Sequence, residues 1–303
     1  MKANRLRELV VISGKGGTGK TSIAASFAAL AENKVMADCD VDASNLHLVL
    51  SPHILERREF VGGSKATVVT EKCVGCGRCA QLCRFDAFSF DGPANDVVAK
   101  TYRVDPLACE GCGVCAHFCP ASAVDFSPRV TGEYYVSATR FGPFIHARLG
   151  IGGGNSGKLV TAVRREAVRV AEDNGLSLLI IDGAPGIGCP VIASLAGAGA
   201  ALIIAEPTVS GLHDMERVAA LAYHFGVQAY VCINKHDLNP AMSKAIERHA
   251  RECGLAVLGK VCYDPAVTRA QMDGLSVIEL GASNAAEDIR RLWNAVERVL
   301  YSS

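Results

Sequence analysis

The chain has 303 residues, enough for one large domain or two smaller ones, and half of its residues are hydrophobic. Lys plus Arg and Asp plus Glu balance at 31 each, so no charge excess points to nucleic acid or a membrane as the main partner. The longest apolar runs, such as 177–181 and 198–205, are too short to span a bilayer. The charged segment 1–9 lacks the apolar core of a signal peptide, and we therefore expect a cytoplasmic protein.

Thirteen cysteines are unusual for such a chain. Disulfides are rare in a reducing compartment, where clustered cysteines usually bind metal or carry out redox chemistry. Eight of the cysteines fall in two tight groups. The other five are scattered, and we expect each to be a small buried side chain: Cys39, Cys189, Cys232, Cys253 and Cys262.

Strands and helices are predicted to alternate along most of the chain. A buried strand at 8–12 runs into a Gly-rich turn and an Ala-rich helix from 21 to about 31, and a second strand follows at 35–39. Later strands are predicted at 176–182, 200–206, 228–234 and 256–261, separated by helices at 159–174, 213–225 and 241–253. The pattern predicts an α/β fold with a parallel sheet covered on both faces and a ligand site at the carboxyl ends of its strands. A final amphipathic helix at 284–300 is expected to pack on the sheet, the alternative being a membrane or partner helix.

The segment from about 59 to 130 interrupts this alternation. Short strands are predicted at 66–70, 87–90, 101–104 and 123–126, and two cysteine groups of identical spacing lie 36 residues apart. We therefore expect an inserted domain at 59–130, with 1–58 and 131–303 forming the α/β domain around it.

Residues 14–21 read Gly-Lys-Gly-Gly-Thr-Gly-Lys-Thr and match the phosphate-binding pattern G-x-x-x-x-G-K-[ST] between a strand and a helix. The glycines let backbone N–H groups point at phosphate oxygens, and the helix N-terminus adds a favourable dipole. Lys20 is predicted to reach the β- and γ-phosphates, and the Thr21 hydroxyl to ligate Mg²⁺. The predicted nucleotide-binding residues in this loop are Gly16, Gly17, Thr18, Gly19, Lys20, Thr21 and Ser22. The alternative is a Gly-rich turn whose lysines occur there by chance.

The form K-G-G-x-G-K-T resembles the deviant Walker A motif of the MinD, ParA and Mrp ATPases and of the nitrogenase iron protein. In that family the early lysine reaches the nucleotide of a dimer partner. The resemblance therefore implies that Lys15 is catalytic and that ATP supports a homodimer or a dimer with a close paralogue. The alternative for Lys15 is a solvent-exposed loop side chain.

Other positions fit the same resemblance. Residues 38–42 look like switch I, in which Asp40 would orient the attacking water. Residues 180–186 resemble Walker B and switch II, with Asp182 holding Mg²⁺ directly or through water. Asn234 resembles the base-reading asparagine of the family, and Asp264 is expected to line the base. Asp40 or Asp182 alone could instead be a helix cap, and Asn234 a turn residue.

The two cysteine groups resemble those of bacterial two-cluster ferredoxins, in which each fourth cysteine ligates the other cluster. One [4Fe–4S] cluster is then expected on Cys73, Cys76, Cys79 and Cys119, and the second on Cys109, Cys112, Cys115 and Cys83. The fourth cysteine of each group is expected to lie on a helix. Arg84 departs from the pattern, because Pro120 occupies the equivalent place in the second group. Zinc is the alternative metal, although its sites usually have a different cysteine spacing.

Nearly the whole chain resembles Mrp/MinD-type ATPases that carry an inserted ferredoxin. The resemblance implies a slow, partner-stimulated ATPase whose nucleotide state controls electron transfer, or assembly and delivery of a metal or iron–sulfur cluster, to a redox or metal-cluster partner protein. One alternative is an electron carrier with ATP as a regulatory switch only. Another is a MinD-like spatial organiser with structural clusters, which the absence of a basic amphipathic anchor at the C-terminal segment disfavours.

Cys189 follows the predicted Walker B aspartate by seven residues, and the nitrogenase iron protein has a cluster-binding cysteine at a similar place. The comparable Gly-rich stretch at 150–158 contains no cysteine here, so a dimer would offer two thiolates rather than four. We therefore expect either a transient metal site at Cys189 or a buried packing role.

Overall fold

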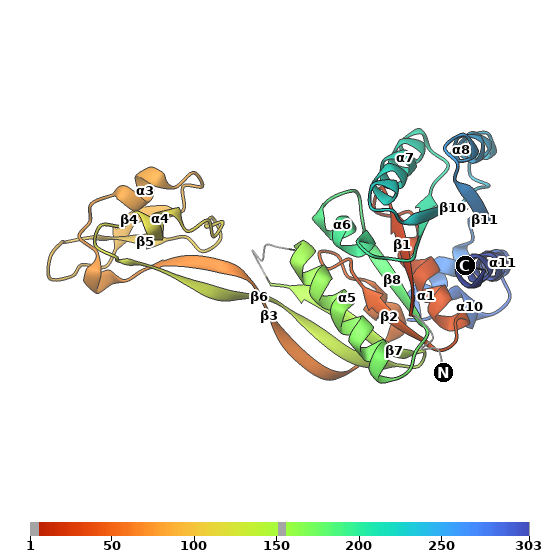
Figure 1. The fold of residues 1–303 in the computed structure, drawn as a ribbon, viewed down its shortest axis with the longest axis horizontal. Helices are drawn as coiled ribbons and strands as arrows, with labels where there is room; N and C mark the ends of the chain where they lie inside the picture. Colours follow the sequence, from red (N-terminus) through yellow and green to blue (C-terminus); the bar gives the residue numbers. More distant parts are fainter. Residues whose placement is uncertain (1–5, 151–155, 303) are drawn as a thin grey trace. The chain divides into compact units, whose positions relative to one another are not determined.

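The computed structural model describes residues 6–150 and 156–302. The chain divides into two compact units (Figure 1). Unit one comprises Met1–Arg58, Tyr134–Arg148 and Ser156–Ser303, and unit two comprises Glu59–Glu133 and Leu149–Asn155. The boundary falls within two long strands, β3 (His53–Val68) and β6 (Val124–Thr139). The predicted insert at 59–130 stays a prediction as an independently folding domain.

A mostly parallel sheet forms the centre of unit one, as the sequence predicts. The strand order is β11-β10-β9-β1-β8-β2-β7-β6-β3, and all pairings from β11 to β7 are parallel. The strands not yet introduced are β1 (Arg7–Ser13), β2 (Lys34–Asp38), β7 (Gly142–Leu149), β8 (Leu178–Pro185), β9 (Ala200–Ala205), β10 (Gln228–Asn234) and β11 (Ala256–Val261). A two-residue connection joins β6 to β7, and such a short link makes the two strands antiparallel.

Helices cover both faces of the sheet. Alternate residues of β1 point to opposite faces, and Leu9 and Val11 join one core that also contains Phe27 and Trp293, whose ring centroids lie 4.9 Å apart. The helices of that core are α1 (Lys20–Leu30), α2 (Leu46–Leu50), α9 (Pro265–Met272), α10 (Val277–Leu280) and α11 (Asn284–Tyr301). The remaining helices of unit one are α5 (Ser156–Asp173), α6 (Cys189–Leu195), α7 (Val209–His224) and α8 (Pro240–Glu252), which pack against strands of the same sheet. The predicted packing of the last helix is confirmed, because α11 contacts β11 and buries Trp293.

Some elements differ from the sequence predictions. The pieces predicted at 66–70 and 123–126 are ends of the 16-residue strands β3 and β6, whose polar and exposed residues hide a strand pattern. Strand β7 was not predicted, and neither were the helices α2, α6, α9 and α10, which have at most eight residues each.

Unit two contains a small antiparallel pair, β4 (Phe88–Gly92) with β5 (Thr101–Val104). Its helical elements are the 3₁₀ turn η1 (Thr70–Lys72) and two short helices, α3 (Arg78–Leu82) and α4 (Val114–His117). A small core of its own contains cysteines from both sequence groups together with Ala66, Ala87 and Val124.

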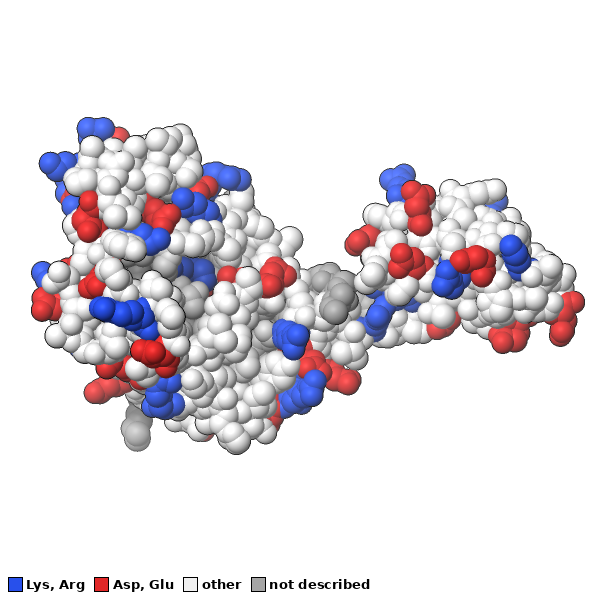
Figure 2. All heavy atoms as spheres, turned by 180° about the vertical axis from the view of Figure 1, so that it is seen from behind, with Lys and Arg blue, Asp and Glu red and all other residues white. Residues whose placement is uncertain are grey.

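The charged side chains are mixed in sign over the face shown in Figure 2, where Lys and Arg lie among Asp and Glu. Within residues 6–150 and 156–302, no helix combines the length and apolar character needed to cross a membrane.

Candidate functional sites

A glycine-rich turn connects the buried strand β1 to α1. Strand β1 lies between β8 and β9, so the turn lies at the carboxyl end of a central strand of the sheet. Gly17 and Gly19 have φ values of 79° and 86°, a region that side chains disfavour. A Cβ on Gly19 would lie 2.3 Å from Nδ2 of Asn234, whereas a Cβ on Gly16 would have no heavy-atom contact within 4 Å. The loop is therefore tightly packed at its helix end and open at Gly16, where a phosphate can approach the backbone.

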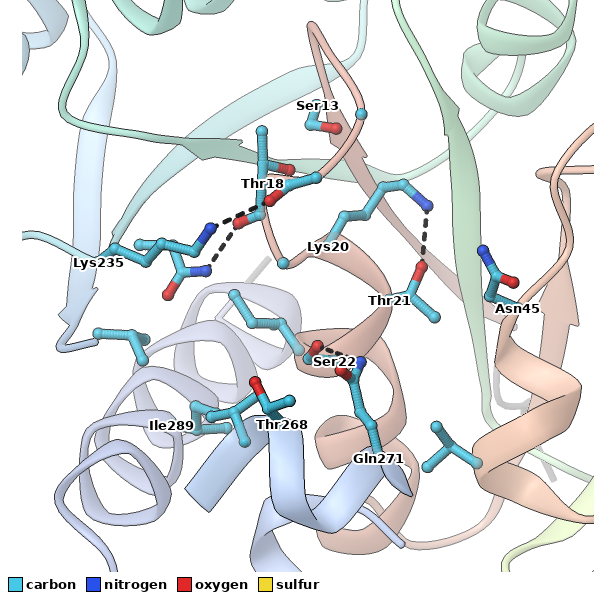
Figure 3. A pocket seen from close by; sticks show the side chains of 18 of the residues that line it. Ser13, Thr18, Lys20, Thr21, Ser22, Asn45, Lys235, Thr268, Gln271 and Ile289 are labelled. Atoms are coloured by element: carbon cyan, nitrogen blue, oxygen red, sulfur yellow. Dashed lines mark hydrogen bonds between the residues drawn. The ribbon is translucent and has the colours of Figure 1, made fainter. Parts of the chain in front are cut away.

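A cavity of about 640 Å³ opens beside this turn, at the carboxyl ends of the strands (Figure 3). It brings together all the predicted nucleotide-binding residues, namely Gly16, Gly17, Thr18, Gly19, Lys20, Thr21, Ser22, Asn234 and Asp264, together with Asp40. Lys15 and Asp182 lie outside the lining, although both contact residues of the site. The sequence did not predict Leu48, Tyr263, Thr268 or Gln271, which line the same cavity.

Lys20 bonds to the predicted magnesium ligand. Its Nζ lies 2.7 Å from Oδ1 of Asp182, 3.4 Å from Oγ1 of Thr21 and 3.8 Å from Oδ2 of Asp40. Burial acts to lower the pKa of Lys20, but the charge and hydrogen bond of Asp182 outweigh it, and the pKa is raised. Lys20 therefore stays charged and can exchange Asp182 for a phosphate.

Asp38 organises the segment that is predicted to be switch I. Only 1% of it is exposed, and its carboxylate accepts hydrogen bonds from the backbone N–H of Asp40 at 3.0 Å and of Leu46 at 3.3 Å, and from Oγ of Ser44 at 2.7 Å. Burial, assisted by the negative charge of Asp182, raises the pKa of Asp38 to about 7. The sequence placed Asp38 in switch I but gave it no role. The hydrogen bonds of Asp38 to backbone N–H groups have no signature in the sequence.

Two buried polar atoms at this site have no hydrogen-bond partner among the described residues, Oγ1 of Thr18 and Oδ2 of Asp182. Buried polar atoms are normally satisfied, so such atoms call for an explanation. Thr18 lines the cavity and Asp182 bonds the lysine beside it. The free oxygens fit a site made for a Mg²⁺–nucleotide, because a carboxylate oxygen and a hydroxyl suit that ion and its phosphates.

The predicted base-binding residues Asn234 and Asp264 lie at the end of β10 and shortly after β11. Asn234 is 8% exposed, and its Nδ2 donates to the carbonyl oxygen of Thr18 at 2.7 Å. Asp264 caps α9 by accepting from the backbone N–H of Ala266 at 2.9 Å, and this bond lowers its pKa. Asp264 therefore caps a helix, which the sequence analysis did not predict, and it also lines the cavity. Nε2 of Gln271 donates to Oγ of Ser22 at 2.8 Å, which joins α9 to the start of α1 (Figure 3).

Lys15 is paired within its own chain. Its Nζ lies 3.1 Å from Oε2 of Glu206 and 3.4 Å from Oγ of Ser210. The other oxygen of Glu206 lies 2.6 Å from Nζ of Lys235, which also donates to the carbonyl oxygen of Gly17 at 3.1 Å. The expected reach of Lys15 toward a partner stays a prediction.

The two cysteine groups in unit two adopt the same local conformation. Positive φ values recur 36 residues apart, at Gly75 and Gly111, Gly77 and Gly113, and Asp86 and Ser122. Exposure repeats as well. The first and third cysteines of each group are buried, the second is exposed and the fourth is intermediate. The repeat in the sequence is therefore also a repeat in three dimensions.

The fourth cysteines do not lie on helices, contrary to expectation. Cys83 is the C-cap of α3, and Cys119 lies two residues beyond α4. Each helix is only one turn long and ends before the fourth cysteine. Each of these thiols accepts a backbone N–H, Cys83 from Ala87 at 3.4 Å and Cys119 from Ala123 at 3.2 Å.

A small cavity brings one predicted ligand set together. Its lining includes three cysteines of the first group and the fourth of the second, namely Cys73, Cys76, Cys79 and Cys119. Among the described residues, no three His, Cys, Asp or Glu side chains surround one point closely enough to hold a single metal ion. A cubane differs from a single ion, because its four cysteines bind different iron atoms. The thiolate donors fit such a cluster in kind.

Side chains from other segments hold the first cysteine of each group. Nδ2 of Asn95 donates to the carbonyl oxygens of Cys73 at 2.7 Å and of Thr70 at 2.6 Å. Nζ of Lys65 donates to the carbonyl oxygen of Cys109. The sequence did not predict either contact.

The scattered cysteines are not all buried. The prediction is correct for Cys39 and Cys232, whereas Cys262 is half-buried and Cys189 and Cys253 are exposed. Cys189 is the first residue of α6. A Cβ on Gly157 of α5 would lie 3.1 Å from the Cβ of Cys189. An exposed first helical residue has no core to pack into, so the buried role expected for Cys189 is wrong. Most of the Gly-rich stretch compared with it, 151–155, lies outside the described residues.

The phosphate loop, the parallel sheet and the cavity at its carboxyl edge define a P-loop nucleotide-binding protein. The CobQ/CobB/MinD/ParA nucleotide binding domain family matches residues 9–277, and the chain belongs to this family. It has a MinD-like α/β fold.

Two curated relatives come from Methanocaldococcus jannaschii. The uncharacterized protein MJ0578 is 33% identical over 237 residues, which is 77% of this chain and 80% of the relative. The uncharacterized protein MJ0579 is 24% identical over 236 residues, or 76% of this chain and 81% of the relative.

Solved structures share the fold at low sequence identity. The septum site-determining protein MinD of Pyrococcus horikoshii OT3, complexed with Mg-ADP, is 15% identical, with a TM-score of 0.60 and 98% of each chain covered. The cell division ATPase MinD of Pyrococcus furiosus is 17% identical, with a TM-score of 0.57 and coverage of 97% of this chain and 99% of that one. A complex of MinC and MinD from Aquifex aeolicus gives 15% identity and a TM-score of 0.56 over 96% of both chains.

Proposed function

We propose that this protein is an ATPase that couples its nucleotide state to electron transfer, or to assembly and delivery of a metal or iron–sulfur cluster, toward a redox or metal-cluster partner protein. The observation that carries the proposal is the presence, on one chain, of a P-loop cavity and two four-cysteine groups of matching conformation. One cavity is lined by the first three cysteines of the first group together with Cys119, the fourth cysteine of the second group. Two structural zinc ions would not require this exchange of cysteines between the groups.

Two [4Fe–4S] clusters are proposed in unit two. One would be held by Cys73, Cys76, Cys79 and Cys119, and the other by Cys109, Cys112, Cys115 and Cys83. When bound, each cluster supplies a one-electron redox centre. The chain contributes the thiolates, the backbone N–H donors to Cys83 and Cys119, and the contacts that fix Cys73 and Cys109. Such N–H···S bonds influence reduction potentials.

The nucleotide cavity provides groups for ATP hydrolysis. Lys20 would bind the β- and γ-phosphates, Thr21 and Asp182 would hold Mg²⁺, and Asp40 would orient water. Asn234 and Asp264 would lie at the base. Lys15 would act on the nucleotide of a second subunit, either another copy or a paralogue, and supply charge to the transition state. An ATPase that needs a second subunit for this charge would be slow until a partner stabilises the dimer.

The cluster proposal is tested by anaerobic isolation and metal analysis. We expect about eight irons per chain, because two cubanes hold that number. Cys112→Ser should damage one cluster preferentially, whereas the matched control Cys253→Ser changes an exposed cysteine outside both groups and should retain the full iron content. Zinc in place of iron in the anaerobic protein would contradict the proposal.

The dimer proposal is tested separately. Lys15→Ala should bind ATP nearly as the parent does but hydrolyse it more slowly and stay monomeric in sedimentation. Unchanged hydrolysis by a monomeric Lys15→Ala protein would overturn the role of Lys15. ATP and ADP should also give different cluster potentials or partner affinities, and equal values in both nucleotides would contradict the coupling.

A second function is favoured by the solved MinD structures, which share the fold. In this alternative the protein is a spatial organiser with structural clusters. A third is an electron carrier in which ATP is only a switch. Electron or metal transfer that requires ATP hydrolysis would favour the first proposal, and transfer supported equally by a non-hydrolysable ATP analogue would favour the electron carrier.

Cys189 is proposed as a transient metal ligand in the closed dimer, a role its exposure permits. Cys189→Ala should then retain both clusters and ATP turnover but lose transfer to the partner that co-purifies anaerobically. Transfer at the parent rate would leave Cys189 without a functional role.

A further inference from the structure

The carboxylate of Glu206 lies between two lysines, of which one belongs to the phosphate loop and the other lines the nucleotide cavity. Oε2 is 3.1 Å from Nζ of Lys15, in the phosphate loop, and Oε1 is 2.6 Å from Nζ of Lys235, which follows β10. Glu206 comes directly after β9, a strand of the central sheet, so its backbone is anchored next to the loop. One carboxylate thus fixes two cations on neighbouring segments.

These contacts direct Lys15 toward its own chain. Lys15 also donates to Oγ of Ser210 in the first turn of α7, so two groups hold its ammonium. Only 15% of the Glu206 side chain is exposed, compared with 33% for Lys15. A lysine that is bonded to Glu206 and Ser210 is unavailable to a second subunit.

Lys235 connects this pair to the phosphate loop. Its Nζ donates to the carbonyl oxygen of Gly17, a residue with positive φ in the part of the loop that faces the cavity. A shift of this loop on nucleotide binding would therefore reach Glu206 through Lys235. Burial acts to raise the pKa of Glu206, but its hydrogen bonds to Lys235 and Lys15 prevail and lower it, so the carboxylate stays charged at neutral pH.

We infer that Glu206 is an intramolecular latch that holds Lys15 in its own subunit and competes with the ATP-dependent dimer. The inference rests on the proposed role of Lys15 toward a partner nucleotide. Closure of the dimer must break the Lys15–Glu206 pair, and this cost raises the ATP concentration at which the dimer forms.

Glu206→Gln tests the latch because glutamine keeps the shape and one acceptor oxygen while removing the charge. We expect the variant to dimerise at an ATP concentration about two- to five-fold lower than the parent, the range for a partly exposed ion pair. The measurement is sedimentation velocity over an ATP titration, with ADP as the reference nucleotide. The matched control is Glu247→Gln, because Glu247 also accepts from two cations, Lys260 at 2.5 Å and Arg251 at 2.7 Å, but outside the cavity lining.

A double variant separates the latch from any effect through Lys235. In the Lys15→Ala background, Glu206→Gln should leave dimerisation unchanged, because no Lys15 remains to be released. Binding of a fluorescent ATP analogue to these monomers reports directly on the nucleotide site. A gain in dimerisation that persists without Lys15 would overturn the latch, and so would an equal gain in Glu247→Gln.

These measurements also distinguish failure of the latch from failure of the proposed role of Lys15 in the dimer. If the parent dimerises in ATP, Lys15→Ala does not, and Glu206→Gln needs as much ATP as the parent or more, the latch is wrong and the dimer role of Lys15 stands. If the parent stays monomeric in ATP and Lys15→Ala hydrolyses ATP at the parent rate, both are wrong.

Discussion

The ammonium of Lys20 lies 2.7 Å from Oδ1 of Asp182, so the predicted phosphate-binding and magnesium-binding side chains are bonded to each other. Both are buried, with exposed fractions of 6% and 1%. Each charge compensates the other in a place where neither would be stable alone. The pair therefore keeps both side chains charged and in place until a magnesium–nucleotide supplies new partners to both groups.

Lys20→Met is expected to abolish ATP binding and to destabilise the protein in the absence of nucleotide. Loss of one partner leaves the other charge buried, which costs roughly 3–5 kcal/mol. Chemical unfolding followed by the fluorescence of Trp293, the only tryptophan, measures the change. Adding Asp182→Asn should recover part of the stability but no ATP binding. A Lys20→Met protein of parental stability would show that Asp182 needs no counter-ion.

The sequence predicted the parts of this site that depend on local pattern. The phosphate loop is a short motif whose glycines have conformational roles, and the strands at 228–234 and 256–261 match β10 and β11 residue for residue. Most of β10 is buried, which makes it a largely apolar run, whereas β11 is an edge strand whose residues are mostly half-buried. The long strands β3 and β6 lack that signal because many of their side chains are exposed.

Contacts between distant segments could not be predicted. The ion pair of Lys15 with Glu206 joins residues 191 positions apart in the chain (206 minus 15), and the bond of Lys65 to the carbonyl of Cys109 joins two others whose pairing has no sequence signature. In the sequence, Glu206 was only the last residue of the strand predicted at 200–206. Tertiary structure decides which cation meets which carboxylate.

His146 is expected to make unit one sensitive to acid. It is 8% exposed on β7, its Nε2 lies 3.0 Å from Oγ of Ser137, and its ring stacks on Phe144 at 4.7 Å. Burial, assisted by the charge of His47, lowers the pKa of His146 to about 4. The unfolded chain therefore binds a proton at this histidine near pH 6.5, whereas the folded chain does not. The unfolding free energy that this difference contributes is complete above pH 6.5 and is lost as the pH falls toward 4.

Between pH 7.5 and 5, this histidine should remove up to roughly 2 kcal/mol of unfolding free energy. His146→Gln should lose that part of the pH dependence, whereas the control His224→Gln changes an exposed histidine and should keep it. Urea unfolding at the two pH values, read by Trp293 fluorescence, gives the comparison. Equal pH dependence in all three proteins would mean that His146 is protonated in the folded state.

Arg140 is expected to hold two walls of the nucleotide cavity in place. From the β6–β7 connection, its guanidinium donates to the carbonyl oxygens of Val49 at 2.8 Å and Gly274 at 3.1 Å, and pairs with Glu279 at 2.6 Å. Val49 belongs to α2, and Gly274 follows α9, two helices whose residues line the cavity. Arg140→Lys cannot reproduce the planar fork and should weaken ATP binding several-fold and lower stability by about 1–3 kcal/mol.

Isothermal titration with ATP and urea unfolding test this prediction. The control Arg251→Lys alters an exposed arginine paired only along α8 and should change neither quantity by more than about 0.5 kcal/mol. If Arg140→Lys matches this control, the β6–β7 connection does not support the cavity.

Lys65 is expected to tune one of the two proposed clusters. Its ammonium bonds the carbonyl of Cys109, whereas the corresponding carbonyl of Cys73 bonds the neutral amide of Asn95. Reduction adds negative charge, which a cation next to a ligand loop stabilises, and net charge and hydrogen bonds both set cluster potentials. Lys65→Met should therefore lower the reduction potential of the cluster on Cys109, Cys112, Cys115 and Cys83. The expected shift is on the order of 59 mV, which corresponds to a tenfold change in a one-electron equilibrium.

Redox titration followed by electron paramagnetic resonance measures both clusters in one sample. Lys65→Met should move one potential and leave the other, and the same substitution in Cys112→Ser, in which the second cluster is damaged, should move none. Lys72→Met is the control, since Lys72 is an exposed lysine next to Cys73 in the first group and should shift potentials less through solvent screening. Equal shifts of both clusters in Lys65→Met would assign the effect to overall charge, because a contact with Cys109 alone acts on the cluster that Cys109 holds.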